Sequence, residues 1–364
     1  MQVCYEDLKR SNEIFEKDIL NAAQKVLTSG WYVLGEEVNT FEQAFAECLK
    51  ASGCVSVASG LDALKLSLIA LELPSDSEII LPSNAYIADV LAVLHAGYKP
   101  VLVEPSIHTY NIDPERIAEA ITQKTAAIIP VHLYGKPADM LSICSIAEEH
   151  GLKVIEDAAQ AHYAKIAEQF VGTFGDCGAF SFYPTKNLGA FGDAGAIFCR
   201  TKDVEQRIRA IRDYGSSQKN VHEYIGYNSR LDGLQAAMLS VKLEHLKAIT
   251  EHKQRLASIY NEKLSDAVIK PVVEKDISDA FHIYAIRHPN RDSLKKDLLS
   301  HGIGTAIHYP TAVFDQPIFS GLWNSDDYPI AREIHDTVLS LPISFGHSED
   351  EIEYVCKILN KVLK

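Results

Sequence analysis

The chain has 364 residues, of which 47% are hydrophobic and 23% are charged, so it has the composition of a globular protein and the length for a large domain with a smaller one beside it. A formal net charge of −14 argues against a general nucleic-acid or anionic-membrane surface, although a pocket with a few local donors could still bind a phosphorylated substrate. No apolar run approaches membrane-spanning length and the N-terminus lacks a basic-then-apolar signal, so we expect a cytoplasmic protein that binds neither nucleic acid nor membrane.

An amphipathic helix is expected at the N-terminus. Apolar residues recur at helical spacing from Glu6 to Leu27, and Gly30 marks the end of the helix. Trp31 and Tyr32 follow side by side in a loop between glycines. Two such rings could stack on a base or a sugar, but packing is the commoner role of adjacent aromatic residues, so both interpretations stay open at this point.

A short strand over Cys54–Val57 leads into a helix that starts at Ser59 and Gly60. Glycine permits close backbone approach, and the free N–H groups of a helix start form an anion site, for which a phosphate is the natural ligand. Asp62 falls in the first turn of this helix, where a carboxylate suits the helix dipole, so we interpret Asp62 as structural.

Strand-like and helix-like patterns alternate through residues 78–150, which predicts a largely parallel sheet with helices on both faces. Tyr86 comes just past a strand end, on the side of such a sheet where ligands bind, although it could also pack at a helix start. His132 follows a later strand, and we interpret it as a satisfied core histidine.

The next predicted strand, L-K-V-I-E, ends beside Glu156, Asp157 and Gln160, where we expect a helix to begin. A carboxylate at the carboxyl end of a strand could hold a protonated heterocyclic nitrogen. The alternative for Asp157 is a helix N-cap, which is a frequent role for a lone aspartate.

Lys186 is the centre of the stretch F-S-F-Y-P-T-K-N-L-G-A-F-G-D-A-G-A, Phe180–Ala196. A buried strand precedes the lysine, Pro184 stops that strand, and three glycines follow. Burial would lower the pKa of this lysine and let its amine form a Schiff base, whereas a lysine tip that reaches solvent would be ordinary. Pyridoxal phosphate needs such a lysine together with an acid on its ring nitrogen, so Lys186 and Asp157 are more specific as a pair than alone.

Two long helical patterns lie within residues 201–240, on either side of a loop that holds Asn228, Arg230 and Asp232. We expect the arginine and the aspartate to form an ion pair that fixes the loop. One long helix is then expected over 241–264.

A smaller domain is expected to begin near residue 265. It has predicted strands at F-H-I-Y-A-I and G-T-A-I-H-Y-P, the second of which ends at His308 and Tyr309. The final helix opens with a capping-box pattern at Ser348 and Glu351.

Cysteine and histidine usage argues against disulfides and metals. The seven cysteines are scattered without a C-x-x-C spacing, so we interpret them as reduced core residues in a reducing compartment. The 14 histidines show no H-x-x-x-H or Cys/His cluster, so we expect no metal site.

Three motifs carry a resemblance that extends over nearly the whole chain: I-E-D-A-A-Q-A, then G-T-F-G-D-C-G-A-F-S-F-Y-P-T-K-N-L-G, then G-Y-N-S-R-L-D-G-L-Q-A-A-M-L. The chain resembles the DegT/DnrJ/EryC1/StrS family of pyridoxal-phosphate-dependent nucleotide-sugar aminotransferases. The resemblance implies an α/β chain of the aspartate-aminotransferase fold (PLP fold type I). Residues 1–240 would form a large domain with a mostly parallel sheet sandwiched by helices, and 241–364 a connecting helix and a small C-terminal α+β domain.

The resemblance also implies the site residues of a homodimer with shared active sites. Lys186 would hold the cofactor and move protons, Asp157 would keep the ring nitrogen protonated, and Asn228 would reach the phosphate of the other subunit. The implied cofactor-binding residues are Gly60, Leu61, Tyr86, Asp157, Gln160, Ser181, Lys186 and Asn228. The residues expected near the substrate are Trp31, Tyr32, Tyr183, His308 and Tyr309.

The implied reaction moves an amino group from L-glutamate to a keto-sugar nucleotide. In relatives that act at C4, the lysine segment typically resembles S-F-H-x-x-K and is followed by a G-E-G-G turn. This chain has Tyr183 in place of that histidine and G-D-A-G after the lysine. We therefore expect amination at C3 of a dTDP-3-keto-6-deoxyhexose, in deoxyamino-sugar biosynthesis for a surface polysaccharide or a secondary metabolite.

Three alternatives remain. One is a C4 aminotransferase that acts on a dTDP- or UDP-4-keto-6-deoxyhexose. Another is a sugar dehydratase, which the presence of Lys186 disfavours because such relatives replace the lysine. The last is a non-catalytic regulatory or binding protein that retains the fold.

Overall fold

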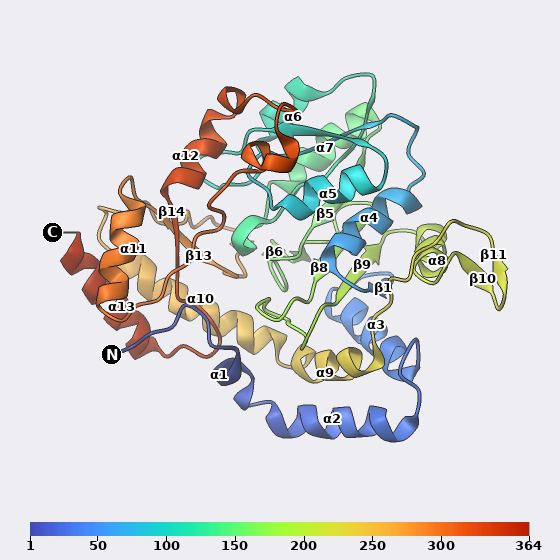
Figure 1. The fold of residues 1–364 in the computed structure, drawn as a ribbon, viewed down its shortest axis with the longest axis horizontal. Helices are drawn as coiled ribbons and strands as arrows, with labels where there is room; N and C mark the ends of the chain where they lie inside the picture. Colours follow the sequence, from blue (N-terminus) through green and yellow to red (C-terminus); the bar gives the residue numbers. More distant parts are fainter. Residues whose placement is uncertain (364) are drawn as a thin grey trace.

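A seven-stranded sheet forms the centre of the computed structural model, which describes residues 1–363 (Figure 1). In spatial order its strands are β1 (Cys54–Val57), β9 (Gly195–Cys199), β8 (Cys177–Ser181), β5 (Lys153–Asp157), β4 (Thr125–Ile128), β2 (Glu78–Pro82) and β3 (Lys99–Val103). Strands from β8 to β3 pair in parallel, whereas β9 is antiparallel to both β1 and β8. The predicted largely parallel sheet is confirmed.

Helices cover both faces of this sheet. They are α3 (Glu36–Cys48), α4 (Gly60–Ala70), α5 (Ile87–His95), α6 (Pro114–Ala120), α7 (Met140–His150), α8 (Lys202–Ile211) and α9 (Gly233–Leu243), and α2 (Glu16–Ser29) packs on the outside of α9. Successive strand residues point to opposite faces, so Ile79 and Leu81 pack with α4, α5 and α8 while Ile80 packs with α6 and α7. Phe180 points to the second of these faces, where α3 and α9 also pack. The apolar runs of the sequence are therefore buried on both sides.

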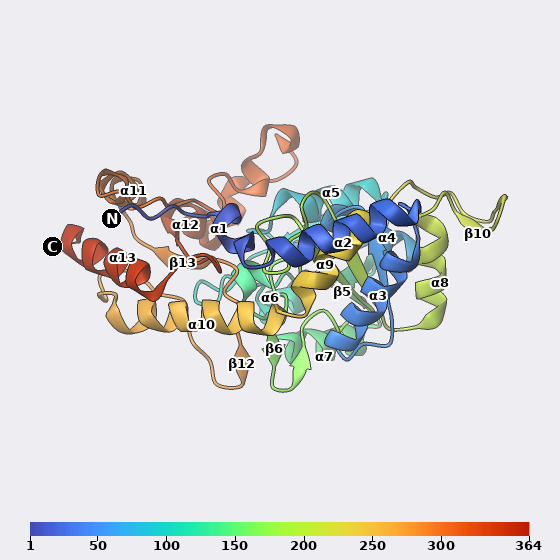
Figure 2. The same cartoon turned by 90° about the horizontal axis from the view of Figure 1, so that it is seen from below.

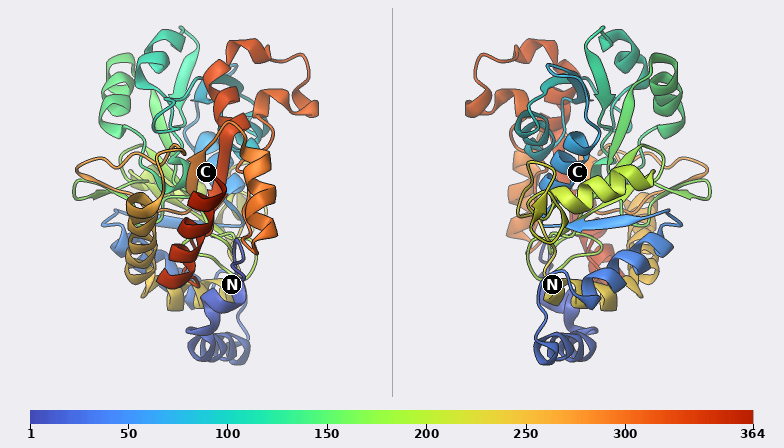
Figure 3. Two further views of the ribbon diagram at one scale, coloured as in Figure 1. Left: turned by 90° about the vertical axis from the view of Figure 1, so that its left-hand side faces the viewer. Right: turned by 90° about the vertical axis from the view of Figure 1, so that its right-hand side faces the viewer.

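A separate core lies in the C-terminal part of the chain. Its elements are α10 (Leu246–Lys263), α11 (Arg291–Ser300), α13 (Glu349–Val362) and the antiparallel pair of β13 (Tyr284–Arg287) and β14 (Val338–Leu341). Val3 packs into this core and its backbone bridges to Ile303, so the N-terminus lies at the same end of the molecule as α13 (Figures 1 and 3). The division between residues 240 and 241 stays a prediction.

Short elements complete the described part of the chain. They are α1 (Leu8–Glu13), α12 (Pro329–Thr337), the sheet of β12 (Ile277–Ser278), β6 (Lys165–Ile166) and β7 (Gln169–Phe170), the hairpin of β10 (Ser216–Gln218) and β11 (Val221–His222), and the 3-10 turns η1 (Leu133–Gly135), η2 (Val313–Asp315), η3 (Pro317–Phe319) and η4 (Ser325–Asp327). The β10–β11 hairpin projects from the body beyond α8 (Figures 1 and 2).

Two predicted helices differ from the structure. The N-terminal helix is split into α1 and α2 at Phe15, although α2 ends as predicted at Gly30, whose φ of 70° favours glycine. The helix expected over 241–264 is also wrong in its start, because the backbone at His245 leaves helical geometry and α10 begins one residue later. The ring of His245 packs on Phe15, with centroids 5.1 Å apart. The helix therefore breaks at a site of tertiary packing, without a glycine or proline in the sequence to mark it. The capping box at the start of α13 is confirmed.

The strand expected over 304–310 is wrong. Within this segment the backbone makes one isolated bridge, between Ala306 and Ser340. The carbonyl of His308 instead accepts a hydrogen bond from the hydroxyl of Tyr134, and the carbonyl of Tyr309 contacts the ring of His335. Side chains take the place of a neighbouring strand for these backbone groups.

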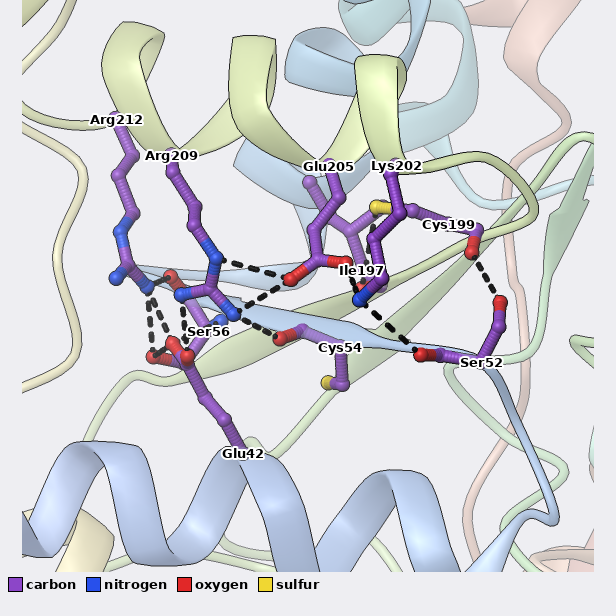
Figure 4. A network of polar contacts seen from close by, with 10 residues as sticks. All are labelled: Glu42, Ser52, Cys54, Ser56, Ile197, Cys199, Lys202, Glu205, Arg209 and Arg212. Carbon is purple, nitrogen blue, oxygen red and sulfur yellow. Dashed lines mark hydrogen bonds and ion pairs between the residues drawn. The ribbon is translucent and has the colours of Figure 1, made fainter. Parts of the chain in front are cut away.

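The buried carboxylate of Glu42 ties α3 to β1 and α8 (Figure 4). It accepts the backbone N–H and the hydroxyl of Ser56 at 2.8 and 2.7 Å, and it pairs with Arg209 at 2.6 Å and with Arg212. Burial alone would raise the pKa of Glu42, but the charges of Arg212 and Arg209 lower it below the usual value. Glu42 is therefore ionised at neutral pH and neutralises two arginines that the fold holds close.

We expect Glu42→Ala to lower the free energy of unfolding by about 3–5 kcal/mol, because it leaves the buried charge of Arg212 without its partner. Since the folded pKa of Glu42 is lowered, its contribution is present above the usual carboxyl pKa of 4.5 and is lost as the pH falls through the lower folded value. Urea unfolding at neutral and acidic pH measures this, and the difference from the parent protein should shrink at acidic pH. Glu353→Ala, which removes an exposed partner of Lys263, is the control and should leave unfolding unchanged.

Candidate active site

A cavity of about 370 Å³ lies where β5 and β8 end and where α4 and α5 begin. This is the side of a parallel sheet on which ligands bind. His308 and Tyr309, from the C-terminal part of the chain, line the same cavity. The sequence-predicted residues that the structure brings together here are Gly60, Leu61, Tyr86, Asp157, Gln160, Ser181, Tyr183, Lys186, His308 and Tyr309.

The loop that carries Lys186 follows β8 directly and folds back tightly on itself. The N–H of Ala190 donates to the carbonyl of Phe182 at 2.7 Å. A Cβ on Gly189 would lie 2.3 Å from the carbonyl oxygen of Pro184, so a side chain does not fit where the loop closes. This close backbone contact explains why a glycine follows the lysine, as the sequence predicted.

The amine of Lys186 has a lowered pKa. Burial lowers the pKa of Lys186 to about 8, while the charges of Asp157 and Asp89 act in the opposite direction. The neighbouring Asn187 is buried and accepts a hydrogen bond from Lys253 at 2.8 Å, which holds the loop in place. The neutral, nucleophilic form of the Lys186 amine is therefore far more populated near neutral pH than in an ordinary lysine.

Asp157 is the last residue of β5, and its carboxylate faces the cavity. One carboxylate oxygen accepts the backbone N–H of Ala159 at 2.8 Å. The helix expected after this strand is absent, because residues 158–163 form turns, so the N-cap alternative for Asp157 is wrong. The carboxylate caps a turn and keeps acceptor capacity for a ligand.

The start of α4 offers backbone donors to the cavity. Ser59 is the N-cap, and its hydroxyl accepts the N–H of Asp62 at 3.1 Å, which leaves the first helical N–H groups, at Gly60 and Leu61, directed out of the helix end. A Cβ on Gly60 would lie 2.7 Å from Cβ of Ser181, so β8 approaches the helix start very closely. These groups form a cradle for an anion.

Asp62 does not join the cradle. Its carboxylate accepts from Lys65 at 2.6 Å and from the hydroxyl of Ser229 at 2.7 Å, in agreement with the structural role we expected.

Two tyrosine rings and a glutamine form another wall of the cavity. The rings of Tyr86 and Tyr309 lie 4.9 Å apart between centroids, tilted by 34°. The side chain of Gln160 donates to the hydroxyl of Tyr309 at 3.0 Å and accepts the N–H of Tyr134 at 2.7 Å, so both ends of its amide are satisfied. Burial lowers the pKa of His308 to about 4, and this histidine is therefore neutral at pH 7.

Three predicted site residues lie outside this cavity. Trp31 and Tyr32 follow α2 with 64% and 51% of their surface exposed, and the indole N–H of Trp31 donates to the carbonyl of Val33 at 2.7 Å. Asn228 is exposed, and its backbone bridges to Asp213. Within one chain, none of the three reaches the groups around Lys186.

Two subsidiary predictions have clear outcomes. His132 is buried and contacts the carboxylate of Glu156 at 3.0 Å, so its interpretation as a satisfied core histidine is confirmed. The ion pair expected between Arg230 and Asp232 is wrong. Arg230 pairs with Asp213 at 2.7 Å, because Asp232 is the N-cap residue of α9 and lies at the start of that helix.

Among the residues that sequence reasoning missed are His282, at the cavity, and Asp89, behind it. His282 lines the cavity, and burial lowers the pKa of His282 well below the usual range. Asp89 lies behind Asp157 in the first turn of α5 and is fully buried. The signal that could have revealed Asp89 is a single acid in the otherwise apolar run Y-I-A-D-V-L-A-V-L, where a core position would normally be apolar.

Comparison with known proteins gives full-length matches. The model of the DegT/DnrJ/EryC1/StrS aminotransferase family matches residues 13–360. The chain is 45% identical to the dTDP-3-amino-3,6-dideoxy-alpha-D-galactopyranose transaminase of Aneurinibacillus thermoaerophilus over 98% of both chains, and 43% identical to the erythromycin biosynthesis sensory transduction protein EryC1 of Saccharopolyspora erythraea over 99% of both. The crystal structure of S. venezuelae DesV in complex with a ketimine intermediate superposes with a TM-score of 0.98 at 39% identity, over 100% of this chain and 99% of that one. The predicted resemblance and fold class are confirmed.

We expect Lys186 of the ligand-free protein to be alkylated with a pH midpoint near 8, its lowered pKa, against 10.5 for an ordinary lysine. Because the negative charge of Asp157 raises the pKa of Lys186, Asp157→Asn should move the midpoint to lower pH. Reductive methylation over a pH series, read by peptide mass spectrometry, measures both, with the other lysines of the digest as internal controls. A midpoint at the ordinary lysine value would contradict the buried environment of the amine.

Proposed function

We propose, since this chain belongs to the DegT/DnrJ/EryC1/StrS aminotransferase family, that it transfers an amino group from L-glutamate to C3 of a dTDP-linked 3-keto-6-deoxyhexose. The observation that carries the proposal is the meeting of Lys186, Asp157 and the N-terminus of α4 in one cavity. A carbonyl-reactive amine, an acid and an anion site are what pyridoxal phosphate requires of a protein. Family membership confirms the predicted enzyme class and cofactor.

The residues of the cavity fit pyridoxal phosphate. The N–H groups of Gly60 and Leu61 and the hydroxyl of Ser181 would hold the phosphate, in a cradle that a Cβ on Gly60 would fill. Asp157 would pair with the ring nitrogen and Lys186 would hold the aldehyde carbon. When bound, the cofactor supplies an electron sink for the carbon that loses its proton.

Lys186 also acts as the base of the proposed reaction. Its amine, with a pKa of about 8, takes a proton from the α-carbon of the amino donor and later returns one to the sugar carbon that receives nitrogen. The carboxylate of Asp157 lines the same cavity, and Gln160 orients the hydroxyl of Tyr309 at the cavity wall. The residues thus divide into those that anchor the ring and the one that moves protons.

Amination at C3 has support from a relative and from the lysine segment. The matching protein of A. thermoaerophilus is named as the transaminase of a dTDP-3-amino-3,6-dideoxy sugar. Tyr183 stands at the position where C4-acting relatives typically have a histidine. It lines the cavity and is 53% exposed, so its phenol can pair with a sugar hydroxyl. A site built to pair one hydroxyl rejects an analogue that leaves its polar groups unpaired. The alternative, amination at C4 of a dTDP- or UDP-linked sugar, places another hydroxyl at Tyr183.

A regulatory role is the second candidate, because one full-length relative is named a sensory transduction protein. A binding protein has no need of an amine with a lowered pKa beside an acid, and both are present here. A visible absorbance band of the purified protein that borohydride removes would favour the enzyme.

We expect dTDP-3-keto-6-deoxyhexose and glutamate to give a 3-amino sugar, with no product from the dTDP-4-keto isomer. Lys186→Ala should abolish turnover and leave the fold unchanged, because the variant loses the base but keeps the phosphate cradle. NMR of the product locates the new amine. Amination at C4 alone would overturn the proposed position on the sugar, and full turnover by Lys186→Ala would overturn the role of the lysine.

We further propose a homodimer with shared active sites. Asn228 and the Trp31–Tyr32 pair lie outside the cavity of their own chain but are exposed. The projecting β10–β11 hairpin leads to Ile225, which is 93% exposed, and α2 carries exposed Leu20 and Leu27, so apolar side chains are available to a second copy. Asn228 would then reach the phosphate cradle of the partner.

Localisation and domain division are proposals of the same kind. Across residues 1–363, the structure contains no helix with both the length and the apolar character needed to cross a membrane. We retain the cytoplasm as the proposed compartment, because the seven cysteines are free. We also retain the division at residue 240, supported by the separate core of α10, α11 and α13.

If the sites are shared, mixing Lys186→Ala chains with Asn228→Ala chains should restore part of the activity, because one site of each heterodimer then has both residues intact. Differently tagged chains purified through both tags provide the heterodimer, and the assay is amino-sugar formation. The control mixes two Lys186→Ala chains and should stay inactive. Confirmed heterodimers without recovery would show that Asn228 serves its own chain or none.

A further inference from the structure

We propose that the carboxyl group of Asp89 is protonated and donates a hydrogen bond to the carboxylate of Asp157, which makes Asp89 a positioning residue for the group that pairs with the cofactor ring nitrogen. The inference rests on the proposed pyridoxal phosphate site. It concerns a residue that does not line the cavity but lies directly behind one that does.

The first observation is the isolation of the Asp89 carboxyl group. Asp89 is the third residue of α5 and has no exposed surface, at 0%. Within residues 1–363, neither of its side-chain oxygens has a hydrogen-bond donor. An ionised carboxylate without a donor is strongly disfavoured in a protein interior, whereas a carboxylic acid carries its own donor and needs only an acceptor.

The second observation is the acceptor beside it. Asp157 on β5 is close enough to Asp89 for a side-chain hydrogen bond, which two ionised carboxylates cannot make. The other titratable groups that face Asp89 are Lys186, on the loop after β8, and Tyr309, from the C-terminal part. Like charges in one site cannot both ionise, so the two carboxyl groups share one negative charge.

The environment decides which of the two keeps the proton. Asp157 is 8% exposed, faces the cavity and already accepts the N–H of Ala159 at 2.8 Å, so its carboxylate is placed as an acceptor. Asp89 has none of these features, and burial together with the charge of Asp157 raises the pKa of Asp89 well above its usual range. The proton therefore stays on Asp89.

The hydrogen bond fixes the orientation of the Asp157 carboxylate towards the cavity. A carboxylate held in this orientation can meet a protonated ring nitrogen directly. Without the donor on Asp89, the carboxylate is free to turn, and its hold on the ring nitrogen weakens.

The test measures binding of pyridoxamine 5′-phosphate to the ligand-free full-length protein over a pH series, by quenching of intrinsic fluorescence. This probe has no aldehyde and does not react with Lys186. Asp89→Asn keeps a neutral donor of the same shape, whereas Asp89→Leu keeps the volume and removes the donor. Asp279→Asn, at a half-buried aspartate whose pKa is raised to about 6 by desolvation, is the control outside the cavity.

We expect Asp89→Asn and Asp279→Asn to follow the parent protein. Asp89→Leu should bind at least about tenfold more weakly, the size of one charge-assisted hydrogen bond. An analogue with C–H in place of the ring nitrogen should bind all variants alike. A matching loss of affinity in Asp89→Asn, or no loss in Asp89→Leu, overturns the proposal.

Infrared spectroscopy keeps the proposal falsifiable where Asp89→Leu fails to fold. The difference spectrum between the parent protein and Asp89→Asn should contain the carbonyl band of a protonated carboxyl group at neutral pH, and a carboxylate band alone overturns the proposal. Failure of the parent protein to bind pyridoxamine 5′-phosphate is a separate outcome, since it overturns the proposed cofactor site itself.

Discussion

The close approach of backbone to backbone between the lysine strand and the start of α4 is the constraint on which the site depends. A Cβ on Gly195 would lie 2.4 Å from the carbonyl oxygen of Ser59, and one on Gly60 would lie 2.7 Å from Cβ of Ser181. Only glycine lets β8, β9 and the helix start share this space. The anion cradle and the reactive amine therefore meet in one cavity, although more than a hundred residues separate them in the sequence.

The opposite wall depends on polar contacts between distant segments. Gln160 joins the turn after β5 to Tyr309, and the carbonyls of His308 and Tyr309 are satisfied by Tyr134 and His335. These contacts bring a segment from the C-terminal part to the cavity that Lys186 also lines. They also explain why this segment is not a strand, because side chains satisfy its backbone from several directions.

The sequence was informative where a local pattern had one physical solution. The parallel sheet, the helix start at Gly60 and the cavity position of Lys186 and Asp157 could be predicted, since strand ends and glycines mark them. The break before α10 could not, because His245 leaves the helix where no sequence signal announces it. Asp89 was not predicted for a similar reason. An acid in the first turn of a helix is common, and only the structure shows that this one is buried beside Asp157.

The position of Arg230 illustrates the limit of reasoning from sequence neighbours. Asp232 is two residues away, yet the arginine pairs with Asp213 because the end of α8 lies beside this loop in space. Asn228, Trp31 and Tyr32 are a second example. Their sequence context did not reveal that they lie outside the cavity of their own chain.

The separate origin of the two cavity walls has a consequence for how such enzymes diversify. The wall around the start of α4 is locked by glycines that tolerate no side chain, whereas His308 and Tyr309 stand on a segment held by replaceable polar contacts. Mutational drift can therefore reshape the wall of His308 and Tyr309, which we propose faces the sugar, while Lys186 keeps its surroundings. A fold built this way can acquire new sugar preferences in small steps, each of which leaves a working catalyst for selection to act on.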